Sequence, residues 1–411
     1  MTLSRSHQFA NTSAAATPMP ASAKRIVSLL EKLQHGVLTV QWPDGQVAQF
    51  GQAHGDELHA HLQLNNWTPL TNAIKSGDIG FAESFIAGDW TSNHVPTLLR
   101  LLIANRRTID DLVYGHWLGR LFYRIKHLLN RNTRSNSQKN IQAHYDLGND
   151  FYQLWLDPTM NYSSAWFAGD FSQTTSYAQD AKVRRALQMV GAKTGDRIME
   201  IGCGWGALAE MGAVDFGAHM HGVTLSHEQL AFAQKRLHTA SGQPAHQLRL
   251  QDYRDIDDGP YDAICSIEMI EAVGHTYWGE YFTTIARLLK TGGKACVQSI
   301  VIDDAFFDRY INSTDFIQQY IFPGGCLPSP SAFKSHAARA GLRVVDEMSF
   351  GRDYAETLRR WRATFLDEKS RVLQLGFDER FMRIWEFYLC YCEAAFDEHN
   401  TDVVQYTLEK I

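Results

Sequence analysis

The residues with the clearest chemical potential form a glycine-rich turn, RIMEIGCGWGA, at positions 197–207. An apolar, strand-like run ends there in Glu200 and leads directly into Gly202, Gly204 and Gly206. Glycines let a backbone turn tightly and approach a ligand where a side chain would collide. The G-x-G-x-G spacing, with an acidic residue two positions earlier, differs from the G-x-G-x-x-G pattern of dinucleotide sites. The turn is therefore expected to hold a cofactor other than a dinucleotide.

This turn resembles the first motif of class I methyltransferases, where the methionine part of S-adenosylmethionine (SAM) lies along the glycines. Two later segments are placed to contact a nucleoside. Thr224 and Gln229 follow a strand-like run and can bond ribose hydroxyls. Asp252 and Tyr253 follow the next strand-like run, where a carboxylate can bond an adenine amino group and a ring can cover the base. A polar turn without a ligand is the alternative for that second segment.

Further segments point to one family when they are read together with the glycine turn. They are AHYDLGNDFY (143–152), LDPTMNYSSA (156–165), SIEMIEAVG (266–274), YIFPGGCLPS (320–329), GVTLS and QDYRD. Together they closely resemble the cyclopropane-fatty-acyl-phospholipid synthases and the related mycolic acid cyclopropane synthases, most strongly over 143–329. The resemblance implies an enzyme that transfers a methyl(ene) group from SAM to the cis double bond of an unsaturated phospholipid acyl chain and forms a cyclopropane fatty acid.

The resemblance also implies residue roles. SAM contacts are implied at Tyr162 and Ser163, which would reach the methionine carboxylate, and at Gly202, Thr224, Gln229, Asp252 and Tyr253. In the implied reaction, the double bond attacks the sulfonium methyl group and leaves a carbocation, from which a base removes a proton to close the ring. In the family this base is a bicarbonate ion, and the positions that match its site are Ser164, Glu271, Gln298, Ile300 and Tyr354.

Two of these positions depart from the family pattern, because Ser164 stands where Cys is common and Gln298 where His is common. Both side chains can donate hydrogen bonds to an anion, but neither adds the positive charge of a protonated His. Bicarbonate binding is therefore left open, and Glu271 is the expected base if the ion is absent. Proton loss elsewhere on the chain would give a methyl-branched alkene instead of a ring, and this alternative is also open.

The elements that must position these residues alternate between helix and strand patterns. A helix is expected at 178–190, and strands at 197–201, 219–224, 247–250, 261–267, 294–300 and 342–350, with a final edge strand at 403–407. This alternation predicts an α/β fold with a doubly wound, mainly parallel sheet, the Rossmann-like fold of class I methyltransferases. We expect this catalytic domain at 141–411.

The N-terminal part is expected to form a flexible tail (1–22), a smaller accessory domain (23–129) and a polar linker (130–140). The accessory domain is predicted to have one short strand at 37–40, a turn at 43–45 and then helices. Its last helix, 118–129, is amphipathic and lies in a stretch without acidic residues between Asp111 and Asp146. That helix either rests on an anionic membrane surface or packs on its own domain with a solvated basic face.

Composition narrows the remaining choices. The net charge of −6 gives no general attraction to nucleic acid, and six cysteines without paired spacing suggest reduced thiols and no metal site. Without a signal or membrane-spanning pattern, we expect a cytoplasmic protein, and peripheral contact with the inner face of the membrane stays open. Trp166, Phe167, Tyr320 and Phe322 are expected to line an apolar tunnel or to pack in the core.

Three other functions remain as alternatives. They are methylation of a small-molecule amine, a lipid-binding protein that has lost catalysis, and a nicotinamide oxidoreductase, which fits the glycine spacing least. The sequence does not determine the acyl length, the double-bond position, the headgroup or the oligomeric state. A homodimer is therefore also open.

Overall fold

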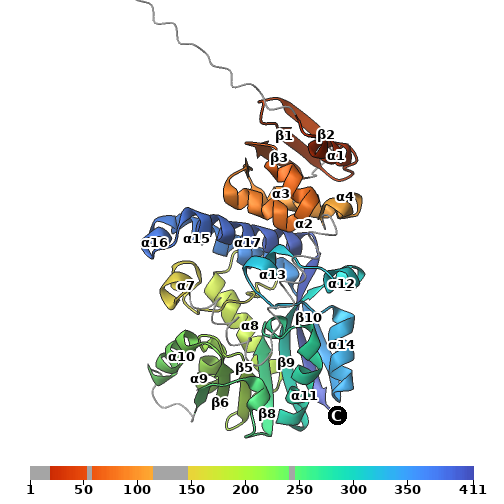
Figure 1. The fold of residues 1–411 in the computed structure, drawn as a ribbon. Helices are drawn as coiled ribbons and strands as arrows, with labels where there is room; N and C mark the ends of the chain where they lie inside the picture. Colours follow the sequence, from red (N-terminus) through yellow and green to blue (C-terminus); the bar gives the residue numbers. More distant parts are fainter. Residues whose placement is uncertain (1–18, 53–57, 114–146, 240–245) are drawn as a thin grey trace, which may run out of the picture.

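The computed structural model describes residues 19–52, 58–113, 147–239 and 246–411. Figure 1 shows a small N-terminal region above a layer of long helices, with a larger sheet below that layer. The membrane-surface helix expected at 118–129, the linker at 130–140 and most of the expected tail lie outside the described residues. Helix α1 (Ala21–Leu30) already begins two residues inside the expected tail, directly after Pro20.

The N-terminal region contains a four-stranded sheet in the order β2-β1-β3-β4. The strands are β1 (Val37–Gln41), β2 (Val47–Gly51), β3 (His59–Leu64) and β4 (Trp90–Thr91), and the helices are α2 (Thr68–Ala87), α3 (Val95–Ala104) and α4 (Arg106–Val113). The first strand and the turn after it are confirmed. The other three strands were not predicted, although β3 alternates between exposed and buried residues as a half-buried strand should.

The larger sheet has seven strands in the order β10-β11-β9-β8-β5-β6-β7. The strands are β5 (Arg197–Ile201), β6 (His219–Thr224), β7 (Gln247–Leu250), β8 (Tyr261–Ile267), β9 (Leu289–Ile302), β10 (Leu342–Ser349) and β11 (Thr401–Lys410). The five strands from β9 to β7 are parallel, and β11 runs antiparallel to both of its neighbours. The predicted fold class is confirmed, and each predicted strand position contains a strand.

The prediction that 403–407 forms an edge strand is wrong. β11 lies between β9 and β10, so that Val403 pairs with Ile300 on one side and Val404 pairs with Ser299 and Ser349. The burial pattern explains the order: β11 has six consecutive buried residues, which suits an interior position, whereas β10 alternates and includes exposed positions, which suits an edge.

Helices cover both faces of this sheet (Figure 1). One face packs against α8 (Thr175–Met189), α9 (Ala207–Val214) and α10 (His227–Thr239), and the other against α11 (Trp278–Leu288) and α14 (Pro330–Arg339). Successive residues of β5 show the division, because Ile198 belongs to the first cluster and Met199 to the second. The helix expected at 178–190 is confirmed as α8.

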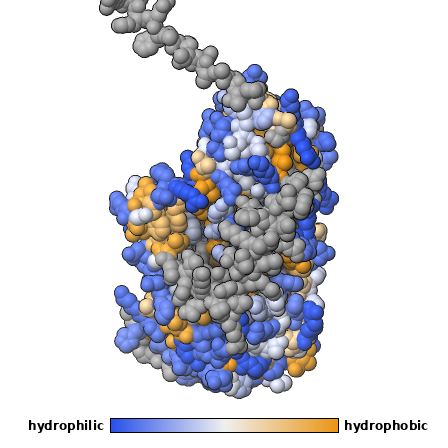
Figure 2. Space-filling view, viewed as in Figure 1, coloured by the Kyte–Doolittle hydropathy of each residue, from blue (hydrophilic) through white to orange (hydrophobic). Residues whose placement is uncertain are grey.

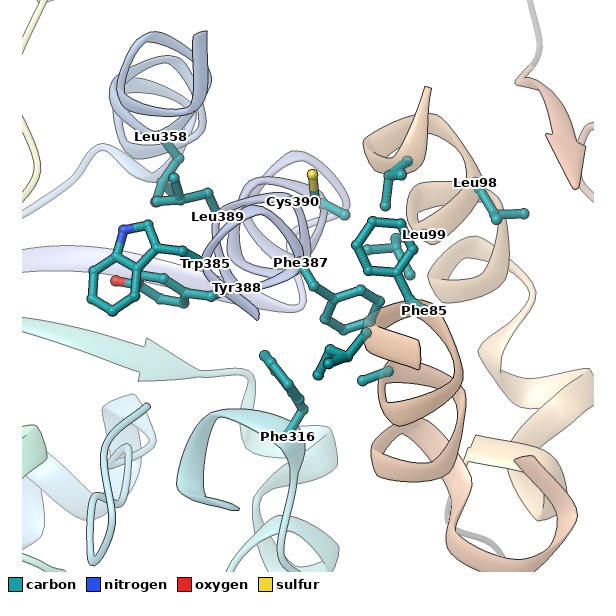
Figure 3. Close-up of a cluster of buried hydrophobic side chains, with 14 of the residues drawn as sticks. Phe85, Leu98, Leu99, Phe316, Leu358, Trp385, Phe387, Tyr388, Leu389 and Cys390 are labelled. Atoms are coloured by element: carbon teal, nitrogen blue, oxygen red, sulfur yellow. The ribbon is translucent and has the colours of Figure 1, made fainter. Parts of the chain in front are cut away.

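The remaining helices lie above the sheet, at the end where the parallel strands finish. They are α7 (Asn149–Trp155), α12 (Asp304–Tyr310), α13 (Phe316–Tyr320), α15 (Gly351–Asp367), α16 (Lys369–Gln374) and α17 (Glu379–Asp397). Figure 3 shows α17 joined to the N-terminal helices through buried side chains. The ring of Phe387 lies 5.6 Å from that of Phe85 in α2 and 4.9 Å from that of Phe316 in α13. One hydrophobic core therefore holds the two regions together.

The coloured surface in Figure 2 is largely hydrophilic, and the most extensive of its apolar patches lies at the outer end of the α15–α16 layer. Leu375, which follows α16, is 44% exposed. Among the described residues, no helix has the length and apolar character needed to cross a bilayer. The same residues contain no cluster of His, Cys, Asp or Glu suited to a metal ion.

Candidate active site

A mostly apolar cavity of about 460 Å³ opens at the carboxyl ends of β5, β6 and β8. Parallel α/β sheets bind ligands at this end, because the loops that follow the strands converge there. The predicted site residues that line it are Tyr162, Ser163, Glu200, Gly202, Gly204, Thr224, Gln229, Asp252, Tyr253, Glu271, Ile300 and Tyr354. Gly206, Ser164 and Gln298 lie behind this lining.

The three glycines of the turn have different roles. A Cβ atom on Gly202 would lie 2.9 Å from the Met269 side chain, and one on Gly206 would lie 2.8 Å from the Cβ of Ala233. Both glycines have a φ of 85°, which disfavours other residues. Gly204 differs, since the space beside it holds no protein atom within 4 Å. Packing therefore requires the outer glycines, and the middle one leaves room for a ligand.

Glu200 ends β5 as a buried carboxylate. Only 4% of the residue is exposed, and its Oε2 atom has no hydrogen-bond partner. Burial raises its pKa well above the ordinary value, and the nearby charge of Lys182 opposes that shift. An ammonium group beside Oε2 would satisfy the carboxylate, so Glu200 and the open space at Gly204 fit the methionine part of SAM.

The expected nucleoside contacts are also brought to the cavity. The Thr224 hydroxyl donates to Gln229 Oε1 at 2.9 Å, which fixes the orientation of the Gln229 amide. The Asp252 carboxylate accepts from Arg254 through Nε at 2.8 Å and through Nη2 at 2.5 Å. The Arg254 amide also donates to Asp252 Oδ1 at 3.0 Å, so Arg254 fixes the orientation of this carboxylate in the cavity wall.

Lys182 is a functional candidate that the sequence reasoning missed. It is fully buried in α8, and its ammonium group donates to Ser163 Oγ at 2.5 Å. Burial lowers its pKa to about 8, and the charges of Glu268 and Glu200 act in the opposite direction. Ala178 and Ala186 flank it at helical spacing on a buried face. A lysine among buried alanines is the signal that could have identified it.

Glu268 is the second missed residue, and it occupies the centre of the expected anion site. Its Oε1 accepts from the Ser164 amide at 2.9 Å and from Gln298 Nε2 at 2.7 Å, while its Oε2 accepts from the Tyr354 hydroxyl at 2.6 Å. Its φ of 50° is rare for a residue with a side chain. The signal was present in the motif SIEMIEAVG, which carries a second carboxylate three residues before Glu271.

The Gln298 amide is held in one orientation by neighbouring side chains. Arg185 Nη1 donates to Gln405 Oε1 at 2.8 Å, and Gln405 Nε2 donates to Gln298 Oε1 at 2.9 Å. The oxygen of Gln298 is thereby engaged, and its Nε2 points at Glu268. This side chain therefore presents a donor, although it does not add a positive charge.

Glu271 lies in the short 3-10 helix Ile270–Ala272 and faces the cavity. Its Oε1 accepts from the Ile300 amide at 2.5 Å, and its Oε2 has no partner. Burial, together with the charge of Glu268, raises its pKa to about 8. Burial also raises the pKa of Glu268, but Tyr354, Lys182, Ser164 and Gln298 oppose that shift. The three donors therefore favour the negative charge on Glu268, whereas the raised pKa of Glu271 favours its protonated form at neutral pH.

A bicarbonate ion does not fit this arrangement. The Ser164 amide, Gln298 and Tyr354 all donate to Glu268, and the Ile300 amide donates to Glu271. The Ser164 hydroxyl donates to the carbonyl oxygen of Ala165 at 2.9 Å. A second anion would meet no available donor among these groups and would be repelled by the Glu268 carboxylate.

Of the four aromatic residues that were expected to line a tunnel or to pack in the core, one lines the cavity and three lie outside its lining. Phe322 lines the cavity, where its ring stacks at 6.4 Å on Tyr162. Phe167 is fully buried away from the cavity, Trp166 packs against the core, and the Tyr320 hydroxyl donates to Glu83 at 2.6 Å. Tyr162 bonds Tyr388 through their hydroxyl groups at 2.7 Å, so it also forms part of an aromatic wall.

Comparisons with known proteins show which family this chain is related to. The profile of the family described as mycolic acid cyclopropane synthetase matches residues 132–406. A tuberculostearic acid methyltransferase from Mycobacterium tuberculosis is 40% identical over 403 residues, which cover 95% of this chain and 92% of the relative. A cyclopropane-fatty-acyl-phospholipid synthase from Escherichia coli is 30% identical over 359 residues, covering 87% of this chain and 90% of that protein.

A solved structure supports the same relationship. The crystal structure of a mycolic acid cyclopropane synthase complexed with SAH and CTAB superposes with a TM-score of 0.62 at 32% identity. The match covers 66% of this chain and 98% of that protein. Fold, sequence profile and full-length relatives agree, and the chain belongs to the cyclopropane synthase family of SAM-dependent methyltransferases.

Proposed function

We propose that this enzyme transfers a methyl group from SAM to the cis double bond of an unsaturated phospholipid acyl chain and releases a methyl-branched, still unsaturated chain. The observation that carries the proposal is the Glu268 carboxylate, which is held by three donors inside an apolar cavity next to the glycine turn. It is a built-in base where the family's resemblance implies a bound bicarbonate ion.

The cofactor part of the proposal rests on the residues at the strand ends. Glu200 and the space at Gly204 would hold the methionine part of SAM, and Thr224, Gln229 and Asp252 would hold its nucleoside. When bound, SAM supplies an electrophilic methyl group on a positively charged sulfur. Lys182 opposes the negative charges of Glu200 and Glu268, which limits the cost of burying both.

In the proposed reaction, the π electrons of the double bond form the new carbon–carbon bond as the methyl–sulfur bond breaks toward sulfur. The Glu268 carboxylate stabilises the positive charge left on the acyl chain and then accepts a proton from a neighbouring carbon. The electrons of that carbon–hydrogen bond form a new double bond. The apolar walls exclude water from the cation, and the ring faces of Tyr162 and Phe322 add to its stabilisation.

Two observations favour a branched product over a ring. The chain is 40% identical to a tuberculostearic acid methyltransferase and 30% identical to a cyclopropane-fatty-acyl-phospholipid synthase. In addition, the proposed proton acceptor is a tethered side chain and not a free ion, so it differs from the base of the ring-forming relatives. A base at a different position can remove a proton from a carbon of the acyl chain instead of from the added methyl group.

The test is incubation of the purified full-length protein with SAM and vesicles of a cis-monounsaturated phospholipid. A ring and a branched alkene have the same mass, so the modified chain must be identified by proton NMR. Vinylic protons in the modified chain, together with uptake of hydrogen on mild catalytic hydrogenation, would support the proposal. Upfield cyclopropane protons would refute the branched product. SAM-dependent methylation of small amines without any lipid product would refute the lipid substrate.

A further inference from the structure

The cavity continues beyond the active site into the core of the N-terminal region. Its lining there comes from β1, β3, α2 and α3 and is aliphatic. We call this part the N-terminal chamber and define it by Leu38, Leu62, Leu70, Ala73, Leu99 and Leu102. The chamber and the catalytic residues Glu268 and Tyr354 belong to the same continuous space.

A hollow core of this kind is unusual, because protein interiors are packed with few voids larger than a water molecule. Empty cavities with aliphatic walls do not hold water well and bind apolar molecules. Side chains away from the chamber are closely packed: Trp90 is fully buried with its ring 4.8 Å from that of Phe85, and neither residue lines the cavity. The chamber is therefore a local feature and not a sign of loose packing throughout the region.

Polar side chains lie where the chamber meets the catalytic part, and they form hydrogen bonds with other residues of the protein. Asp78 accepts from the Tyr391 hydroxyl at 2.9 Å, and burial together with the charge of Asp315 raises its pKa to about 7. Arg106 donates to Asn400, and its guanidinium lies 4.4 Å from the ring centre of Phe306. The cavity therefore passes from the catalytic part to the chamber between polar side chains that are already bonded to other protein groups.

The backbone is adapted to this passage. Helix α2 is interrupted at Gly77, which has a φ of 62° and lines the cavity. A straight helix would carry the next turn along the same axis, whereas the break redirects Asp78 toward α13 and α17. The Asp78 carboxylate accepts there from the Phe316 amide at 3.3 Å. The break thus occurs at the point where the cavity passes between the two regions.

We propose that the N-terminal chamber receives the methyl-terminal segment of the acyl chain and so sets the length of chain that the enzyme accepts. This inference rests on the proposed function, since it takes the substrate to be an unsaturated acyl chain. The double bond lies beside Glu268, the methyl end extends past Asp78 into the chamber, and the ester and headgroup remain on the other side. A charged headgroup would lose its hydration against the aliphatic chamber wall.

The expected dependence on length follows from the burial of methylene groups. A CH₂ that enters the chamber fills empty space but comes from bilayer hydrocarbon that is as apolar as the wall, so the gain in kcat/KM stays below the approximately fourfold that about 0.8 kcal/mol per CH₂ taken from water would give. The gain should stop when the chamber is full. Lengthening the chain on the ester side should have little effect, because that segment lies outside the chamber.

The experiment uses two series of phosphatidylglycerol vesicles with the full-length enzyme and SAM. In one series the cis double bond keeps its distance from the ester while the methyl side grows, and in the other the methyl side is constant while the ester side grows. Ala73→Leu narrows the chamber by three carbon atoms and should move the methyl-side optimum to shorter chains. Ile103→Ala widens the cavity and should move the optimum to longer chains.

Ile86→Ala is the matched control, because Ile86 is buried in the same region but does not line the cavity. It should lower the melting temperature without moving the optimum. An optimum unchanged by Ile103→Ala would overturn the inference, as would an optimum that shifts only in the ester-side series. If Ala73→Leu does not fold, Ile103→Ala still provides the comparison.

Photolabelling separates this inference from the proposed function. A phosphatidylglycerol with a diazirine at the methyl end of its acyl chain should label peptides of α2 and α3 in the wild-type protein. Labelling there without any lipid turnover would support the chamber while refuting the proposed reaction. Labelling confined to other segments would overturn the chamber even if the lipid is methylated.

Discussion

Replacement of Glu268 by Gln removes the proposed base and keeps the size of the side chain. The amide oxygen can still accept from the Ser164 amide and Gln298, which both donate to Oε1 in the wild-type protein. The amide nitrogen would face the Tyr354 hydroxyl, which can reverse its role and accept. Because all three hydrogen bonds survive, the free energy of unfolding should change by no more than about 1 kcal/mol.

Catalysis should respond far more strongly than stability. Loss of a positioned general base lowers rates by roughly 10²- to 10⁴-fold. This corresponds to an increase of about 3–5 kcal/mol in the activation barrier. Binding of SAM should be nearly unchanged, since Glu268 is not among the groups proposed to contact the cofactor. The expected signature is therefore a large fall in kcat with a nearly constant dissociation constant for SAM.

The assay measures single-turnover methylation of vesicle lipid together with SAM binding by calorimetry. Glu271→Gln is the comparison variant, because the pKa of Glu271 is raised to about 8 and its carboxyl is already protonated at pH 7. It should lose less than about tenfold in rate. Wild-type turnover by Glu268→Gln, or a greater loss in Glu271→Gln, would refute the assignment of the base.

A second substitution at the same position tests the anion-site argument. Glu268→Gly removes the carboxylate and the left-handed strain, which costs about 1–2 kcal/mol for a residue with a Cβ. The donors from Ser164, Gln298 and Tyr354 would then face a space of carboxylate size. Added bicarbonate or formate should restore part of the lost rate, whereas no rescue at any concentration would contradict a shared anion position.

Three other predictions concern stability and cofactor binding. The folded-state pKa of Asp78 is raised from 3.8 to about 7, so protonation of this carboxyl stabilises the folded state. This stabilisation is lost as pH rises from about 4 through 7, and the melting temperature should fall over that range. Asp78→Asn should make the melting temperature less dependent on pH. Gly206→Ala should destabilise the protein by about 1–3 kcal/mol in urea unfolding, since its Cβ would lie 2.8 Å from that of Ala233. Lys182→Met should weaken SAM binding at least tenfold in calorimetry, because Ser163 loses its Lys182 donor and Glu200 loses the charge that opposes its protonation, and unchanged affinity would contradict that role.

Local patterns in the sequence predicted a large part of the catalytic fold. The apolar runs at 197–201, 219–224 and 261–267 are strands because each is short, apolar and bounded by turn residues. The glycine turn was also predictable, since its steric requirement acts between neighbours in the chain and with the helix that follows. The family motifs carried the cavity residues that stand at the strand ends, such as Gly202, Thr224 and Asp252.

The proposal that Glu268 is the base depends on the tertiary structure. Glu268 is bonded by residues that lie 104, 30 and 86 positions away, and no local pattern indicates that Ser164, Gln298 and Tyr354 converge on it. The separation of charge between Glu268 and Glu271 likewise depends on donors and burial supplied by other segments. The sequence therefore suggested Glu271 as the base in the absence of bicarbonate, and Glu268 became a candidate only through its tertiary contacts.

The order of the last strands and the extent of the cavity were also tertiary outcomes. The pattern at 403–407 predicted a strand, but its interior position depends on pairing with β9 and β10 together. The aliphatic residues of α2 and α3 look like ordinary core residues in the sequence. They line a chamber because the break at Gly77 and the packing of α17 leave space between elements that are distant in the chain. Sequence determines which residues must be buried, whereas the packing of whole elements determines where the interior is left open.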